Sequence, residues 1–193
     1  MKLKRVVIGS YVENCYLLID DNEKSAYIVD PGDDVEKVIK VVGDLQLDVI
    51  AVLITHGHFD HTNGIKKIKE TFGVKVYMNK LDLPLVTDAD QVDEEIKDGD
   101  LFNLGSDAIK AIATPGHSMG GMCFLCGNIL ISGDTLFKSS IGRTDMYGGD
   151  YAQLIDSIKT KLFVLPDEVA VYPGHGFSTT IGYEKATNPF LNE

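Results

Sequence analysis

The chain has 193 residues, of which 44% are hydrophobic, so it is long enough to fold as one globular domain, residues 1–193, with a substantial core. Its formal charge of −11 argues against binding to nucleic acid or to an anionic membrane, because such binding depends on Lys and Arg that neutralise phosphate. No apolar run could span a bilayer, and the run at residues 6–8 is too short for a signal peptide. We therefore expect a cytoplasmic monomer or small homo-oligomer with a small-molecule partner.

The first third of the chain is predicted to form strands around one helix. Apolar stretches at 5–9 and 14–19 flank a polar turn and predict a hairpin. Residues 26–29 predict a third strand, which ends in the turn signal Asp30-Pro31-Gly32. Spacing of i, i+3, i+4 and i+7 then predicts an amphipathic helix with the apolar face Val35, Val38, Ile39 and Val42.

The apolar run at 49–54 predicts a buried strand, and it leads directly into a cluster that holds three of the five histidines. Imidazole and carboxylate groups suit zinc, iron or manganese, so a metal site is favoured over a polar loop that happens to be rich in histidine. In an extended loop His56 and His58 point the same way and can bind one ion. Asp60 and His61 turn to the opposite side as a helix begins. The cluster thus predicts two ions about 3.5 to 4 Å apart.

The middle of the chain is predicted to continue with a helix over about 62–72 and a short strand at 74–78. Residues 79–100 are acidic and weakly patterned. Strands follow at 108–113, 122–126 and 129–133. The pair Cys123 and Cys126 lies on a strand that predicts a hairpin with the next one, so its sulfurs should face opposite sides of the sheet. An odd number of cysteines fits a reducing compartment.

Two of these strands end at polar motifs, Thr114–His117 and Ser132–Thr135. Residues 135–149 predict a long functional loop. A helix over about 150–162 and a strand at 168–172 follow, and that strand leads to His175. Strands followed by alternating helices and strands, twice over, predict an α+β fold with two sheets packed face to face and helices outside.

The remaining candidate ligands have natural places in a two-metal centre. His117 would complete the first site, His175 the second, and Asp134 can bridge the two ions. Two divalent ions with Asp60, Asp134 and one hydroxide leave a net charge of about +1, which would stabilise a developing oxyanion. The expected nucleophile is a metal-activated hydroxide, because metal binding brings the pKa of water to about 7. No histidine is left to activate a Ser or Cys side chain.

The order His56-x-His58-x-Asp60-His61, then His117, Asp134 and His175, resembles the metallo-β-lactamase superfamily, and the resemblance extends from about residue 14 to residue 188. Four further motifs resemble the glyoxalase II-like, or hydroxyacylglutathione hydrolase-like, enzymes and the related persulfide dioxygenases. These motifs are Gly133–Phe137, Gly142–Asp145, Tyr172–Gly176 and Asn188-Pro189.

The resemblance implies an αββα four-layer sandwich, with two mixed sheets and the metals at one edge between them. It implies a hydrolase that cleaves a small thioester or ester, with Asp60 and Asp134 as catalytic metal ligands and Asp30 as a group that orients ligands. Two divalent ions are expected, with zinc favoured and iron or manganese as alternatives. A mononuclear iron persulfide dioxygenase is the alternative function, with its iron held by His56, His58 or its neighbours, His117 and Asp134. Full glyoxalase II has a further C-terminal helical region that holds glutathione, whereas this chain stops soon after residue 188. The expected substrate therefore need not be a glutathione thioester.

Several residues near these motifs have two interpretations each. Arg143 and Asp145 form either a surface ion pair or a contact to substrate, and Lys138 is either solvated or attracts an anionic substrate. Phe59 and Phe137 form either apolar walls of the site or ordinary packing contacts.

Overall fold

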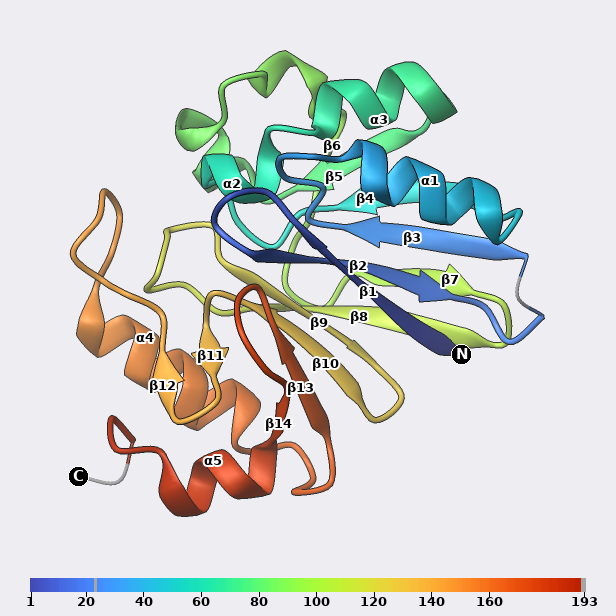
Figure 1. The fold of residues 1–193 in the computed structure, drawn as a ribbon. Coiled ribbons are helices and arrows are strands. Elements are labelled where there is room, and N and C mark those ends of the chain that lie inside the picture. The colour runs from blue at the N-terminus through green and yellow to red at the C-terminus, as the bar shows by residue number, and fades with distance from the viewer. Residues whose placement is uncertain (23, 192–193) are drawn as a thin grey trace.

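The computed structural model describes residues 1–22 and 24–191, which form two β-sheets packed face to face with helices on both outer sides (Figure 1). Helices α1 (Glu36–Asp44) and α3 (Ile65–Phe72) lie against one sheet. Helices α4 (Tyr151–Ser157) and α5 (Ile181–Thr187) lie against the other. The predicted α+β sandwich is confirmed.

The first sheet has the strand order β1-β2-β3-β4-β5-β6. Its first three strands pair antiparallel, whereas β3 to β6 pair parallel. Parallel neighbours need a crossover, and α1 and α3 make those crossovers between β3 and β4 and between β4 and β5. The strands are β1 (Lys2–Ile8), β2 (Glu13–Ile19), β3 (Ser25–Val29), β4 (Asp48–Leu53), β5 (Lys75–Met78) and β6 (Glu94–Glu95).

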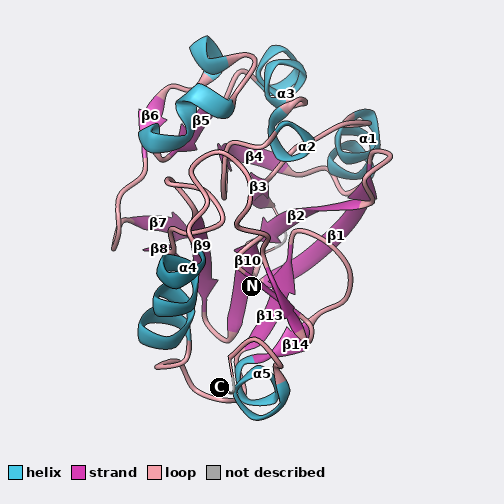
Figure 2. Ribbon diagram, turned by 90° about the vertical axis from the view of Figure 1, so that its left-hand side faces the viewer, coloured by secondary structure: helices cyan, strands magenta, loops and turns pink. Residues whose placement is uncertain are grey.

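The second sheet has the order β14-β13-β10-β9-β8-β7, and only β10 and β13 pair parallel. Helix α4 makes the crossover between them and continues as the π-helical turn Ile158–Leu162. Figure 2 shows the same layers from another side, with α1, α2 and α3 together and α5 at the opposite end. The strands are β7 (Leu101–Leu104), β8 (Asp107–Ala113), β9 (Met122–Cys126), β10 (Ile129–Gly133), β13 (Ala170–Pro173) and β14 (Thr179–Thr180).

Three apolar layers hold the sandwich together, one between the sheets and one beneath the helices on each side. Strand β2 is buried along its whole length because its two faces belong to different layers: Leu17 packs toward α1, and Leu18 packs between the sheets. On β9, Cys126 faces the layer between the sheets and Cys123 faces the layer under α4. The predicted divergence of these two sulfurs is confirmed.

The element boundaries differ from the sequence prediction in two places. The helix expected over about 62–72 begins only at Ile65, as α3, and a separate short helix, α2 (Phe59–Thr62), precedes it. Between them Gly64 packs against the turn after β3, where an added Cβ would lie 2.5 Å from the Gly32 carbonyl oxygen. The long loop expected at 135–149 contains a small hairpin of β11 (Leu136–Phe137) and β12 (Ser140–Ile141).

The weakly patterned segment 79–100 contains two 3₁₀ helices, Lys80–Leu85 and Ala89–Gln91, before β6 adds an edge strand to the first sheet. Strand β7, strand β14 and helix α5 were not predicted. Within the described residues, no helix combines the length and the apolar character that a membrane crossing requires.

Candidate metal centre

The strands that precede the candidate ligands all end at one edge of the sandwich. Strands β8, β10 and β13 run in the same direction, and the loops after them carry His117, Asp134 and His175. At this edge the Met122 N–H donates to the carbonyl of Thr55, two residues after the end of β4, at 2.8 Å and joins the two sheets. The topology thus brings together groups from distant parts of the chain, as predicted.

Three sets of described side chains lie close enough to hold a metal ion, and one of them, Asp30, His56 and His61, overlaps the other two. His56, His58 and His117 form the set that we call the imidazole group. Their ligand atoms lie within 4.8 Å of one another, and all three side chains are buried. Nδ1 of His58 lies 3.0 Å from Nε2 of His117. The buried Nε2 of His56 has no hydrogen-bond partner among the described residues. Such an orphaned nitrogen, aimed among other imidazoles, is what a metal ligand leaves when no ion is present.

In His56 and His117 the other ring nitrogen contacts a neutral oxygen, whereas the buried Nε2 of His58 has no hydrogen-bond partner within the described part of the chain. Nδ1 of His56 lies 3.0 Å from the Thr55 hydroxyl, and Nδ1 of His117 lies 2.8 Å from the Arg143 carbonyl oxygen. Burial and the neighbouring imidazoles hold the pKa of His56 well below its ordinary value, and burial lowers the pKa of His58 as well. Both rings therefore favour the neutral form, which binds metal ions.

Asp60, His61 and His175 form the second group, which we call the carboxylate group. Nε2 of His175 lies 3.1 Å from Oδ2 of Asp60 and 3.3 Å from Nε2 of His61. Behind this group, Nδ1 of His61 lies 3.0 Å from Oδ2 of Asp30. The other carboxylate oxygen of Asp30, Oδ1, accepts a hydrogen bond from the Thr55 N–H at 2.7 Å. Asp30 therefore orients His61, as the sequence resemblance implies.

Electrostatics in the carboxylate group differ from those in the imidazole group. Burial disfavours the charged form of His61, but the nearby Asp134 and Asp30 outweigh it and raise the pKa of His61 to about 10. Burial likewise opposes ionisation of Asp60, but the hydrogen bond from His175 and the charge of His61 lower the pKa of Asp60 to about 2. In the metal-free protein this group is a set of ion pairs.

Asp134 lies between the two groups. Its Oδ1 is 3.6 Å from Nε2 of His61, and its Oδ2 is 3.7 Å from Nε2 of His117. Oδ1 is buried without a hydrogen-bond partner in the described residues. Gly174 makes this approach possible, because an added Cβ there would lie 2.3 Å from Asp134 Oδ1 and 2.6 Å from His61 Cε1.

The donor set fits divalent metal ions. Two ligands each about 2.05 Å from one tetrahedrally bound ion are roughly 3.3 Å apart. The separations of 3.0 Å between His58 and His117 and of 3.1 and 3.3 Å around His175 are close to that value. Nitrogen and carboxylate oxygen donors suit zinc, iron and manganese. The structure thus brings all seven predicted ligands together.

Two buried carboxyl groups beside the site were not predicted. Glu13 is 1% exposed, neither of its carboxyl oxygens has a hydrogen-bond partner in the described chain, and its Oε1 lies 3.8 Å from Nδ1 of His61. Burial raises the pKa of Glu13 well above its ordinary value. Asp82, from the weakly patterned segment, contacts the loops of the imidazole group. No spacing in the sequence distinguishes either residue from an ordinary surface acid.

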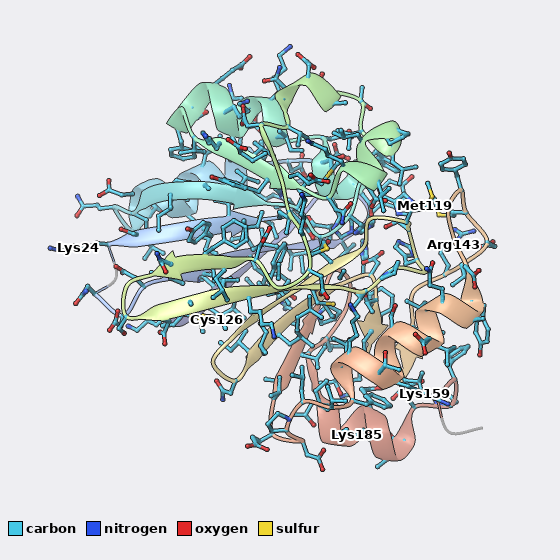
Figure 3. The ribbon with its side chains drawn as sticks, turned by 180° about the vertical axis from the view of Figure 1, so that it is seen from behind. Lys24, Met119, Cys126, Arg143, Lys159 and Lys185 are labelled. Carbon is cyan, nitrogen blue, oxygen red and sulfur yellow. The ribbon has the colours of Figure 1, made fainter. Side chains whose placement is uncertain are left out.

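A hollow of about 270 Å³ opens from the two groups to solvent. Phe59 lines it and packs edge-on against Tyr11 with the ring centroids 5.1 Å apart, so Phe59 is a wall of the site. Arg143 also lines the hollow and pairs with Asp145 through two hydrogen bonds of 2.7 and 2.8 Å, which is the predicted surface ion pair. Figure 3 shows Arg143 and Met119 at one edge of the molecule, opposite Lys24.

The family model of the metallo-beta-lactamase superfamily matches residues 8–175, a range that contains both groups. The chain belongs to this superfamily. The hydroxyacylglutathione hydrolase GloC of Haemophilus influenzae is a relative, with 36% identity across 100% of this chain and 99% of that protein.

Several solved structures share the fold. The BLEG-1 B3 metallo-beta-lactamase is similar with a TM-score of 0.89 and 34% identity, over 100% of both chains. ETHE1 from Myxococcus xanthus has a TM-score of 0.87 and 31% identity, over 98% of this chain and 84% of that one. TTHA1623 in a di-iron-bound form has a TM-score of 0.87 and 35% identity, over 97% of this chain and 100% of that one.

Proposed function

We propose that this superfamily member is a glyoxalase II-like hydrolase that cleaves a small thioester or ester with two divalent metal ions. One observation carries the proposal: two groups of three ligands lie side by side, and the carboxylate of Asp134 faces an imidazole of each. The full-length similarity to hydroxyacylglutathione hydrolase GloC supports a thioester as the substrate class. The three free, buried cysteines fit a cytoplasmic location.

Each group would hold one ion. His56, His58 and His117 supply three neutral donors to the first, and the Asp60 carboxylate joins His61 and His175 at the second. Asp134 would contribute to both. We propose zinc as the native metal because nitrogen and carboxylate donors suit it. Iron is the alternative, since the similar TTHA1623 was solved in a di-iron form.

The chain's own side chains define what the site can do. When bound, divalent ions supply a Lewis acid and lower the pKa of coordinated water to about 7. The carboxylates of Asp60 and Asp134 offset part of the cationic charge, which leaves a site that attracts an oxyanion. All five histidines lie in the centre, so no Ser or Cys has a histidine base of its own.

The leaving group also constrains the substrate. Phe59, Met146 and the ring of Tyr11 give the hollow apolar walls, and the described residues that line it include no carboxyl or imidazole group outside the ligand set. A thiolate leaves without protonation more readily than an amine does, so the site suits thioesters better than amides.

The test begins with protein purified without added zinc. Metal content per chain is measured, and hydrolysis is followed on a panel of thioesters, including a 2-hydroxyacyl glutathione thioester, together with aryl esters, lactones and β-lactams. We expect two metals per chain and the highest kcat/KM on a thioester. Stripped protein should regain activity on metal addition. Metal-loaded protein that hydrolyses none of the panel would contradict the proposal.

A mononuclear iron persulfide dioxygenase is the second candidate. The likeness to ETHE1 favours it, and so does the burial of the imidazole group, which could hold one iron together with Asp134. Oxygen consumption on a persulfide, measured with metal analysis of anaerobically purified protein, separates the two functions. One iron per chain with rapid oxygen uptake would replace the hydrolase proposal.

A further inference from the structure

A buried carboxylate outside the ligand set joins the two loops that carry the imidazole group. Asp82 lies in the 3₁₀ helix Lys80–Leu85 and is 0% exposed. Its Oδ2 accepts from the Gly57 N–H at 3.0 Å and from the Ser118 hydroxyl at 2.6 Å. Its Oδ1 accepts from the Gly120 N–H at 2.6 Å.

Two of the three donors to Asp82 adjoin the imidazoles in sequence. Gly57 lies between His56 and His58, and Ser118 follows His117 directly. One carboxylate therefore fixes the loop after β4 relative to the loop between β8 and β9. The distance between these two loops determines the separation of 3.0 Å between His58 Nδ1 and His117 Nε2.

Packing around Asp82 leaves no room for adjustment. A Cβ at Gly57 would lie 2.5 Å from the Asp82 carbonyl oxygen, and a Cβ at Gly120 would lie 2.8 Å from its Cγ. Both loops thus approach Asp82 as closely as glycine allows. Asp82 has no hydrogen bond to an imidazole in the described structure, so it acts through the backbone of the loops.

We propose that Asp82 is a positioning residue that sets the metal affinity of the imidazole group and leaves the carboxylate group unaffected. The inference rests on the proposed metal centre and adds a residue to it. A carboxylate that only braced the fold would lower the stability of the whole protein without distinguishing one metal site from the other.

Asp82→Asn is the sharpest substitution because it preserves the volume of the side chain. Whichever oxygen becomes the amide nitrogen, it faces a backbone N–H, of Gly57 in one orientation and of Gly120 in the other. The side-chain amide N–H and the backbone N–H would then be two buried donors that face each other without an acceptor, so the loop that carries the backbone N–H must move. Loss of such a supporting contact typically lowers metal affinity about 10- to 100-fold.

The experiment measures zinc affinity by equilibrium dialysis in two backgrounds that each leave one group intact. In His175→Ala protein, Asp82→Asn should weaken binding of the remaining zinc by about tenfold or more. In His117→Ala protein, Asp82→Asn should leave zinc affinity unchanged. Equal weakening in both backgrounds, or no change in either, would overturn the inference.

Glu184→Gln is the matched control. Glu184 is also 0% exposed and accepts from three donors, Ser139 N–H, Thr179 Oγ1 and Asn188 Nδ2, none of which adjoins a candidate ligand. This variant should lower the Tm of the metal-free protein without changing zinc affinity in either background. A selective loss at the imidazole group in Glu184→Gln would overturn the assignment to Asp82.

Ser118→Ala provides a milder test if Asp82→Asn does not fold. It removes one donor and keeps the carboxylate with its two backbone partners, so zinc affinity should fall in the His175→Ala background alone, by less than with Asp82→Asn. No selective loss would overturn the inference. Absence of zinc binding by the wild-type protein would overturn the metal centre itself, and the role of Asp82 with it.

Discussion

The two halves of the candidate centre use similar donors in different surroundings. His56, His58 and His117 are 2%, 8% and 4% exposed, and the imidazoles of His56 and His117 are oriented by a hydroxyl and a carbonyl oxygen. In the carboxylate group each imidazole instead faces a carboxylate, His61 against Asp30 at 3.0 Å and His175 against Asp60 at 3.1 Å.

This difference decides how each half behaves before a metal arrives. Burial and the neighbouring imidazoles lower the pKa of His56, so this imidazole is already in its metal-binding form. Burial lowers the pKa of His61, but the neighbouring carboxylates outweigh it and raise that pKa to about 10, so a metal must displace a proton there.

The largest effect is expected where the two halves meet. Asp134→Ala removes the one carboxylate that faces both groups, at 3.6 Å from His61 and 3.7 Å from His117. We expect the loss of at least one metal per chain and a fall in kcat/KM of about a hundredfold or more, beyond what a supporting residue costs. Metal analysis and thioester hydrolysis measure these effects. Unchanged metal content would show that Asp134 does not join the groups.

A change behind the carboxylate group should affect that half alone. Asp30 holds His61 and accepts two hydrogen bonds from Thr55, at 2.7 Å from its N–H and 2.6 Å from its hydroxyl. Asp30→Asn should weaken the second metal about 10- to 100-fold and spare the first. Equilibrium dialysis with zinc in the His117→Ala and His175→Ala backgrounds measures the affinity of each metal site separately. A loss at the imidazole group of the same size would mean that Asp30 supports both halves through Thr55.

The pH dependence of the metal-free protein sharpens the comparison without any metal. The folded-state pKa of His61, about 10, lies above its ordinary 6.5, so its ion pairs stabilise the fold fully below pH 6.5 and that contribution is lost as pH rises through 10. The pKa of His56 is lowered, so its contribution is present above pH 6.5 and is lost as pH falls. Imidazole NMR titration and Tm against pH measure both. A His61 ring that titrates near 6.5 would contradict this contrast.

The sequence predicted the ligands and the fold more completely than it predicted their supports. The candidate site could be predicted because three of the five histidines lie in one short segment and each of the other ligands follows the end of a predicted strand. Periodicity placed α1 and most strands, because apolar residues at regular spacing report which face is buried. The later start of α3 coincides instead with the packing of Gly64 against Gly32, which no local pattern records.

The roles of Asp82 and Glu13 could not be predicted from the sequence for a related reason. Asp82 lies among many acidic residues, and its role arises only when segment 80–85 packs against loops from both sheets. Glu13 was assigned to a turn, yet it begins β2 and is buried next to His61. Long-range contacts of this kind come from tertiary structure, so they cannot be derived from spacing along one strand or helix.

The smallest effect is expected at Arg143, which touches the imidazole group through its backbone. Its carbonyl oxygen holds Nδ1 of His117 at 2.8 Å, whereas its exposed side chain pairs with Asp145. Arg143→Ala keeps the carbonyl, so metal content and Tm should stay at wild-type values, because exposed ion pairs contribute little. Asp145→Ala is the matched control, since it breaks the same pair and leaves the cation in the hollow. A higher KM for an anionic thioester in Arg143→Ala, but not in Asp145→Ala, would show that the guanidinium contacts substrate. A loss of metal in Arg143→Ala would show that the side chain itself supports His117.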